Sequence, residues 1–586
     1  MEKNKQLIAA LVLSGLIGIA HADEKEELLK LRNTTVNLIK QLVKQGVLTD
    51  KMAKEMIKQA ETDAVKQVAD AKAAGGKEAA AGQEAGAGQG RGTAAGREAV
   101  PADEVRVAYV PDFVKDEIRQ QVRSELREEV VGDVMQKAKN EHWGMPDALP
   151  EWTRRFKLSG DMRLREQSNF MAAYNQPFSY YNWQTINAQG NFNGANGLSG
   201  AGANAYQNTK LNRHVARERF RFGIDAEVAN GVDAGIRLAT GNTPNPVSTN
   251  QSLGNTGAQY QFAVDRAFLR YNAYDEKKFN WLTVIGGRTP NPFFTAGSEL
   301  VWDEDLSFEG AAATVRHRLT SNDMSDDVGG KGPAVFATAG IFPMQTSNLI
   351  SGLSNRDKWM MGGQAGLDWG FDNQDSLQIG GAYYDYQNIK ALLNKTGTSQ
   401  CSQNTPDINQ SVPQFMQGGN SLTSICNSND GLAGGLVGLA SDYKILDINM
   451  LYDMAIFSPI HVKFSADFAK NLGFNRKKIL AYTGQDIAEE TTAWQFKIDL
   501  GWTKLNTFGT WNVFTGYKYV ERDAVLDAYT DSDFHNGGTN VKGWMLGGNY
   551  GLMKNVWLTG RWLSGDVITG PRYGLDVMQL DLNTRF

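Results

Sequence analysis

Apolar and polar residues alternate without a break at the end of the chain, in the stretch QLDLNTRF from Gln579 to Phe586. Leu580, Leu582 and Phe586 share one parity, and polar residues fill the other. A period of two places successive side chains on opposite faces of an extended chain. The stretch therefore predicts a β-strand with one apolar and one polar face.

The same alternation recurs from residue 154 to the end of the chain. In 213–228, five apolar residues alternate with charged ones, and Asn230-Gly231 then predicts a tight hairpin into 232–239. Sixteen strands are predicted, at 154–165, 213–228, 232–239, 260–273, 279–288, 305–318, 333–343, 357–370, 375–386, 443–454, 459–469, 492–503, 508–520, 541–551, 555–565 and 574–586.

The connections between these strands are of two kinds. Links after most even-numbered strands are short, such as Asn230-Gly231 and 552–554, whereas links after odd-numbered strands include 166–212 and 387–442. Short turns at one end, long loops at the other and an even strand count are typical of transmembrane barrels of the bacterial outer membrane. The expected fold is thus mainly β, an antiparallel transmembrane β-barrel of about 16 strands in residues 153–586.

A water-soluble barrel or sandwich is the alternative, and the net charge of -5 is compatible with it. However, the face formed by Trp494, Phe496, Ile498, Leu500 and Trp502 carries an aromatic residue at each end, as in strands that reach both membrane interfaces. The last strand is expected to close the barrel against the first, and a final Phe resembles the C-terminal assembly signal of outer-membrane proteins.

The first residues predict export from the cytoplasm. Lys3 and Lys5 precede an apolar stretch at 7–20, and Ala20-His21-Ala22 offers small residues for signal peptidase, so residues 1–22 resemble a cleaved signal peptide. An uncleaved anchor is the alternative, but the apolar stretch is short for a membrane helix.

The segment between this signal and the strands is predicted to be largely helical. Residues 23–70 have apolar residues at three- and four-residue steps, which indicates a helical hairpin or coiled coil. Residues 71–100 are rich in Ala and Gly and predict a flexible linker. Residues 101–152 contain a predicted periplasmic helix at 111–139, either an oligomeric coil or a single amphipathic helix.

Positive charge gathers on the polar parity of the first strands, which would face the lumen. Such arginines would form a basic pore lining, or would pair with lumen acids such as Asp161 and Asp265 and stiffen the wall. The predicted pore-lining residues are Arg163, Arg165, Arg217, Arg219, Arg221, Arg237, Arg266, Arg270, Arg288, Arg316 and Arg318.

An acidic loop, 289–305, is predicted to fold inward opposite these arginines as a constriction loop. Its acids are Glu299, Asp303, Glu304 and Asp305. If they pointed outward, they could instead bind divalent cations at the cell surface. Because selectivity is set at the narrowest point of a pore, the sequence leaves open whether anions or cations are preferred.

The two cysteines, Cys401 and Cys426, lie in the longest predicted loop, and an oxidising compartment favours a disulfide between them, worth roughly 3 kcal/mol. Two cysteines without a nearby histidine do not make a zinc site, and no cofactor is expected. The chain has no common hydrolase, zinc-protease or nucleotide-binding motif, so an enzyme is not expected. The charge balance also argues against nucleic acid as a partner.

Several stretches resemble the putative porin family of Gram-negative outer membranes, whose members also carry a helical N-terminal region. The stretches are RLATGNTPNPVSTNQSLG (237–254), DRAFLRY (265–271), GGRTPNPFF (286–294) and LVWDEDLSFEGAA (300–312). The resemblance implies a diffusion channel but not a particular solute.

The first functional hypothesis is therefore a passive outer-membrane porin for small hydrophilic solutes or ions. By analogy with porins of this size it would be a homotrimer in contact with lipid and lipopolysaccharide, with its N-terminal helices in the periplasm and able to reach peptidoglycan. The alternative is a structural tether or adhesin in which the barrel anchors a periplasmic coiled coil. A ligand-gated active transporter is disfavoured, because a 22-stranded barrel with its plug needs a longer chain.

Overall fold

The computed structural model describes most of the chain that follows residue 152. The described residues are 153, 155–188, 206–241, 245–319, 333–346, 356–371, 373–392, 411–425 and 437–586. The predicted signal peptide, helices and linker lie outside these residues, as do Cys401 and Cys426.

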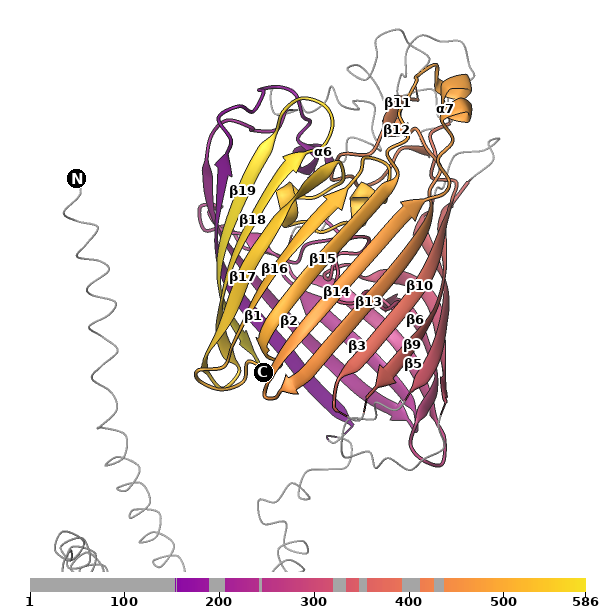
Figure 1. Ribbon diagram of the computed structural model, residues 1–586, viewed down its shortest axis with the longest axis vertical. Helices are drawn as coiled ribbons and strands as arrows, with labels where there is room; N and C mark the ends of the chain where they lie inside the picture. Colours follow the sequence, from indigo (N-terminus) through magenta and orange to yellow (C-terminus); the bar gives the residue numbers. More distant parts are fainter. Residues whose placement is uncertain are drawn as a thin grey trace, which may run out of the picture. The chain divides into compact units, whose positions relative to one another are not determined.

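A single closed antiparallel barrel contains the described strands, apart from a small two-stranded sheet in one loop (Figure 1). Its sheet consists of sixteen long strands and the two-residue strand β4, Gln251–Ser252. The long strands are β1 (Phe156–Met171), β2 (Arg213–Ala229), β3 (Val232–Ala239), β5 (Ala263–Tyr274), β6 (Asn280–Thr289), β7 (Phe308–Arg318), β8 (Ala334–Gln345), β9 (Lys358–Gly370), β10 (Ser376–Gln387), β13 (Lys444–Phe457), β14 (Ile460–Asn471), β15 (Thr492–Trp502), β16 (Trp511–Val520), β17 (Val541–Met553), β18 (Val556–Val567) and β19 (Gly574–Arg585).

Each long strand pairs with its neighbours in sequence, and β19 pairs with β1 to close the ring. The register places Leu582 opposite Leu164, and Phe586 exchanges two backbone hydrogen bonds with Gly160. Closure leaves no unpaired sheet edge, which a structure surrounded by lipid requires. The predicted sixteen-stranded barrel and its closure by the last strand are confirmed.

The outer face of the barrel is apolar, as the alternating pattern predicted. Leu158, Leu269 and Trp544 each expose about three fifths of their surface, although a soluble protein would bury such residues. On β15, Trp494 and Trp502 share this outer parity. Lipid is the solvent that such a surface fits.

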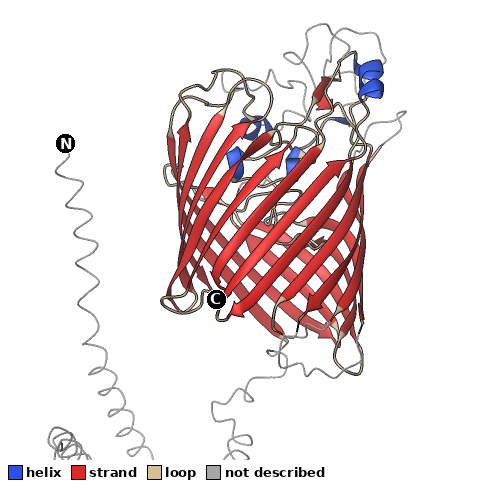
Figure 2. Cartoon of the chain, in the orientation of Figure 1, coloured by secondary structure: helices blue, strands red, loops and turns tan. Residues whose placement is uncertain are grey.

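The two ends of the barrel differ in their connections (Figure 2). At one end lie turns such as Gly231 and its neighbour Asn230, between β2 and β3. The other end carries long loops with short elements of their own. These elements are α6 (Trp183–Ala188), β11 (Leu422–Ser424), β12 (Val437–Leu439), α7 (Arg476–Thr483), η6 (Asp527–Tyr529) and η7 (Phe534–Asn536).

The main apolar core lies within the barrel, where two loops pack against the lumen side of the wall. Loop 290–307, between β6 and β7, contributes Phe293 and Trp302, whose rings lie 5.1 Å from that of Tyr384 on β10. Gly362 on β9 makes room for this contact, since an added Cβ would lie 2.5 Å from the Phe293 ring. Loop 521–540, between β16 and β17, adds a second layer to the same core.

None of the helices in the described part of the chain is long and apolar enough to cross a membrane.

Candidate pore constriction

Strands β1 and β2 place a concentrated group of arginines on the lumen side of the wall. The register sets Arg163 opposite Arg219, and Arg165 opposite Arg217, on the parity that alternates with outward apolar residues. Arg163, Arg165 and Arg219 each expose less than a tenth of their surface. These arginines therefore share one parity of the strands, and other groups of the protein cover much of their surface.

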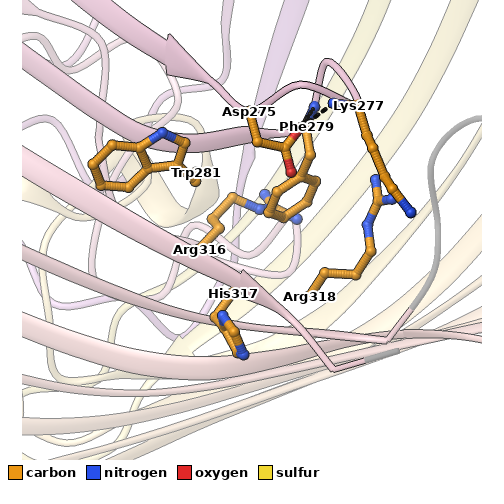
Figure 3. A pocket seen from close by; sticks show the side chains of 7 residues that line it. All are labelled: Asp275, Lys277, Phe279, Trp281, Arg316, His317 and Arg318. Atoms are coloured by element: carbon orange, nitrogen blue, oxygen red, sulfur yellow. Dashed lines mark hydrogen bonds between the residues drawn. The ribbon is translucent and has the colours of Figure 1, made fainter. Parts of the chain in front are cut away.

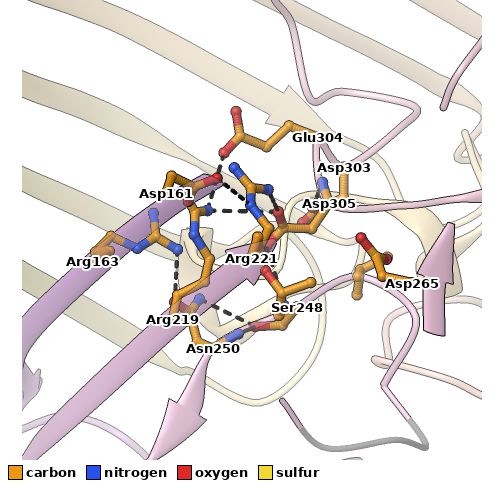
Figure 4. Close-up of polar contacts among 12 residues, drawn as sticks. Asp161, Arg163, Arg219, Arg221, Ser248, Asn250, Asp265, Asp303, Glu304 and Asp305 are labelled. Atoms are coloured by element: carbon orange, nitrogen blue, oxygen red, sulfur yellow. Dashed lines mark hydrogen bonds and ion pairs between the residues drawn. The ribbon is translucent and has the colours of Figure 1, made fainter. Parts of the chain in front are cut away.

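Loop 290–307 brings its acidic end to these arginines (Figure 4), while its aromatic residues pack against Tyr384 on β10. Asp305 accepts a hydrogen bond from Arg221 at 2.9 Å and lies 3.6 Å from Arg219. Its other oxygen accepts from the backbone and hydroxyl of Thr249. Burial would raise the pKa of Asp305, but the guanidinium groups outweigh it, so the pKa is lowered. The carboxylate thus clamps the loop to the arginines.

Asp161 on β1 shares the same arginines. It lies 3.0 Å from Arg219 and accepts from Arg221 at 2.8 Å. Glu304 reaches to 3.9 Å from Arg219 but leaves about two thirds of its side chain exposed. The two acidic groups nearest to Arg219 and Arg221 therefore belong to the wall and to the loop, and both reduce the positive charge there.

Loop 521–540 also binds to the arginines of the wall, through Asp533, a contact that the sequence did not predict. Asp533 accepts two hydrogen bonds from Arg165, at 2.8 and 2.9 Å, and a further one from Arg561 on β18 at 2.9 Å. Arg165 also donates twice to Asp581 on β19. Burial would raise the pKa of Asp533, but Arg165, Arg561 and Arg163 hold it well below its ordinary value. The loop is thus fixed to the wall by a buried network of ion pairs.

A second acidic group joins the two loops to each other. Carboxylate oxygens of Glu299, Asp303 and Asp531 lie within 4.8 Å of one another, close enough to share a cation. Lys518 on β16 already donates to Asp531 at 2.7 Å, and Asp303 accepts from the backbone of Ser532 at 2.9 Å. The lysine gives this cluster a counter-ion from the protein itself.

The pKa values of this cluster are shifted upward. Burial, with repulsion from Asp531 and Glu304, raises the pKa of Glu299 to about 8. Burial and the neighbouring acids also raise the pKa of Asp303 well above its ordinary value. Of the four predicted loop acids, Asp305 contacts the arginines directly, Glu304 faces their margin, and Glu299 and Asp303 meet the second loop instead.

Other predicted arginines lie further along the wall. Arg237 pairs with Asp265, and Arg270 on β5 pairs with Asp233 at 3.0 Å. The Nε of Arg266 donates at 3.3 Å to the hydroxyl of Ser307. Pairing with lumen acids, which the sequence allowed as a stiffening role, therefore occurs at several of these positions.

Arg288 differs from the rest in its strand parity. It pairs in register with Ala267 and shares the parity of Val284, which points outward. Its guanidinium group donates to Glu309 on β7 and to a backbone carbonyl of β5. Arg288 therefore lies on the other parity from the arginines of β1 and β2.

Arg316 and Arg318 lie at the opposite end of the wall, beside the turn between β5 and β6 (Figure 3). Arg316 pairs with Asp368 at 3.0 Å, and the guanidinium group of Arg318 lies 4.6 Å from the centre of the Phe279 ring. These two side chains line a shallow pocket at the short-turn end and are separate from the constriction.

The sequence matches one family, described as putative porin, over residues 32–586. The chain belongs to the putative porin family. This membership supports an outer-membrane β-barrel channel protein. The resemblance seen in the sequence is confirmed.

Several solved structures match the chain at low sequence identity. They include the outer membrane channel DcaP of Acinetobacter baumannii, at 11% identity over 74% of this chain and 97% of that one, with a TM-score of 0.34. Pseudomonas putida OprB matches at 10% identity over 76% and 97%, with a TM-score of 0.40. Salmonella typhi OmpF matches at 11% over 74% and 97%, with a TM-score of 0.34. No curated protein matched the chain.

Proposed function

We propose that this porin is a passive, water-filled diffusion channel for small hydrophilic solutes or ions. The observation that carries the proposal is the juxtaposition of lumen arginines with the acidic end of loop 290–307, joined by the contacts of Asp305 with Arg219 and Arg221. A fixed field between opposite charges orients water and sorts solutes by charge and dipole at a constriction.

The sign of the selectivity follows from which charges remain unpaired. Asp305 and Asp161 already have arginine partners, and Asp533 is held between Arg165 and Arg561. These acids therefore weaken the positive face without reversing it. We propose a preference for anions.

The surroundings of the barrel follow from the same proposal. Short turns of outer-membrane barrels face the periplasm, so the long-loop end would face the outside, in contact with lipid and lipopolysaccharide. A homotrimer is proposed by analogy with porins of this size. The N-terminal helices would lie in the periplasm, where they could join the trimer or contact peptidoglycan.

Single-channel recording of the refolded protein in a planar bilayer tests this function. Stable openings in symmetric KCl are expected, and a salt gradient should give a reversal potential of the sign for chloride preference. A folded, heat-modifiable barrel that never conducts would refute the channel and favour the tether or adhesin. Deleting residues 23–150 and measuring envelope stability would then test that alternative directly.

A further inference from the structure

Three pairs of arginines face each other directly across neighbouring strands of the lumen wall. Like charges directly opposite one another destabilise an antiparallel strand pair. The barrel nevertheless keeps all three in one sector of its wall. The pairs are Arg163 with Arg219 and Arg165 with Arg217, between β1 and β2, and Arg237 with Arg266, between β3 and β5.

Only one member of each pair has a close carboxylate partner. The partnered members are Arg219 with Asp161, Arg165 with Asp581 and Asp533, and Arg237 with Asp265.

The opposite member of each pair has carboxylates in its surroundings but no ion pair shorter than 4.0 Å among the described residues. Arg163 lies 4.0 Å from the nearest oxygen of Asp581, at the limit of an ion pair, and donates to the amide oxygen of Asn250. Arg266 reaches the Ser307 hydroxyl, and the side chain of Arg217 has no hydrogen bond or ion pair among the described residues. Three guanidinium groups in this sector therefore keep an unfilled capacity for anions.

Buried donors mark two of these arginines. The Nε atoms of Arg163 and Arg217 are buried and have no acceptor among the described residues. Arg163 exposes 8% of its surface. An unsatisfied buried donor is unfavourable, and more so on a charged group. Both guanidinium groups therefore carry their charge with incomplete hydrogen bonding inside the protein.

The two residues are also close enough to act together. Arg163 lies opposite Arg219, and Arg217 is two residues from Arg219 on the same face of β2. Diagonal neighbours of this kind are about 7 to 8 Å apart along the sheet, within reach of long side chains. One carboxylate or phosphate group can accept hydrogen bonds from both guanidinium groups, in the forked geometry that arginine favours.

The groups that contact or flank these arginines can be counted. They are eight guanidinium groups and six carboxylates, an excess of two positive charges that does not include the neighbouring cluster of Glu299, Asp303, Asp531 and Lys518. The cations are Arg163, Arg165, Arg217, Arg219, Arg221, Arg237, Arg266 and Arg561, and the acids are Asp161, Asp265, Glu304, Asp305, Asp533 and Asp581.

We propose that Arg163 and Arg217 form a subsite of the lumen that binds the carboxylate or phosphate group of a small anionic solute. This inference rests on the proposed channel function and names the class of solute that the constriction favours. Arg266 on β5, opposite Arg237, offers the anion a further guanidinium partner. A solute would thus exchange one guanidinium partner for another as it crosses the constriction.

Binding and block by succinate, with inorganic phosphate as a second probe, test the subsite. Millimolar succinate is expected to interrupt the single-channel current transiently, and calorimetry on the detergent-solubilised barrel should detect the same binding. The double variant Arg163→Gln with Arg217→Gln should weaken both about tenfold, equivalent to about 1.4 kcal/mol. Arg217→Lys should weaken succinate binding and block less, because lysine keeps the positive charge but loses the forked hydrogen-bond geometry of the guanidinium group.

Lys497→Gln is the matched control, because it removes one lumen cation from β15, where Lys497 pairs with Asp499 at 2.9 Å. It should leave succinate binding unchanged.

Equal effects of the double variant and the control would overturn the subsite and indicate a general charge effect. Ordinary conductance without succinate binding would also overturn it while leaving the channel intact, whereas binding without conductance would refute only the channel. Heat-modifiable migration checks the fold, and the single Arg217→Gln variant, expected to weaken binding severalfold, decides the question if the double variant misfolds.

Discussion

Replacing Asp533 with Asn should release loop 521–540 from the barrel wall. Asp533 bridges Arg165 and Arg561, and the side chain of Arg165 is fully buried. Removing one partner of a buried ion pair costs about 3 to 5 kcal/mol. Because Arg165 keeps its two hydrogen bonds to Asp581, we expect the lower end, about 3 kcal/mol.

A change of about 3 kcal/mol raises the population of a displaced loop by roughly 100-fold. Single-channel recordings of Asp533→Asn should therefore show added current noise and visits to a higher conductance level that are rare in the parent protein. Asp233→Asn is the control, since Asp233 and Arg270 form a partly exposed pair worth about 1 kcal/mol or less. If Asp533→Asn gave the conductance and noise of the parent, the loop would not be held by this network.

Three further changes test other contacts of the constriction. The pKa of Glu299 is raised from 4.5 to about 8, so the contact between the two loops should lose stability as pH rises through this range. Glu299→Gln should abolish the resulting increase in current noise between pH 4.5 and 8. Gly362→Ala places a methyl group 2.5 Å from the Phe293 ring and should lower the free energy of unfolding by about 1 to 3 kcal/mol, measured by gel-shift melting. Gly363→Ala is the control and should be neutral, because its Cβ would meet open space. Asp305→Asn removes a negative charge from the constriction and should increase the chloride-to-potassium permeability ratio; an unchanged ratio would place the selectivity elsewhere.

The strands could be predicted from the sequence because the barrel has a different solvent on each face. Lipid on one side and polar lumen on the other impose a period of two, which survives even though the average hydropathy is low. The predictions fail where that contrast ends. The first strand extends to Met171 rather than residue 165. Its additional residues begin with Glu166, which lies on the outward parity. From Glu166 to Asn169 both faces are polar, so the alternation no longer marks a strand.

The constriction could be predicted only in part. Loop 290–307 is recognisable because its acids complement the arginines of the wall. Loop 521–540 gives no such local signal: its polar residues fit an exposed loop equally well, and Asp533 meets Arg165 across 368 positions of sequence. The distinction between partnered and unpartnered arginines also depends on these distant contacts, since Arg165 and Arg217 have the same parity and neighbouring strands.

The reversal potential of single channels in a KCl gradient tests the central claim most directly. If the guanidinium groups around Arg163 and Arg217 outweigh the acids of the loops, the potential should shift toward the equilibrium potential of chloride, and the shift should shrink in the double Gln variant. A shift toward the equilibrium potential of potassium would show that the loop acids control the constriction and would contradict the account.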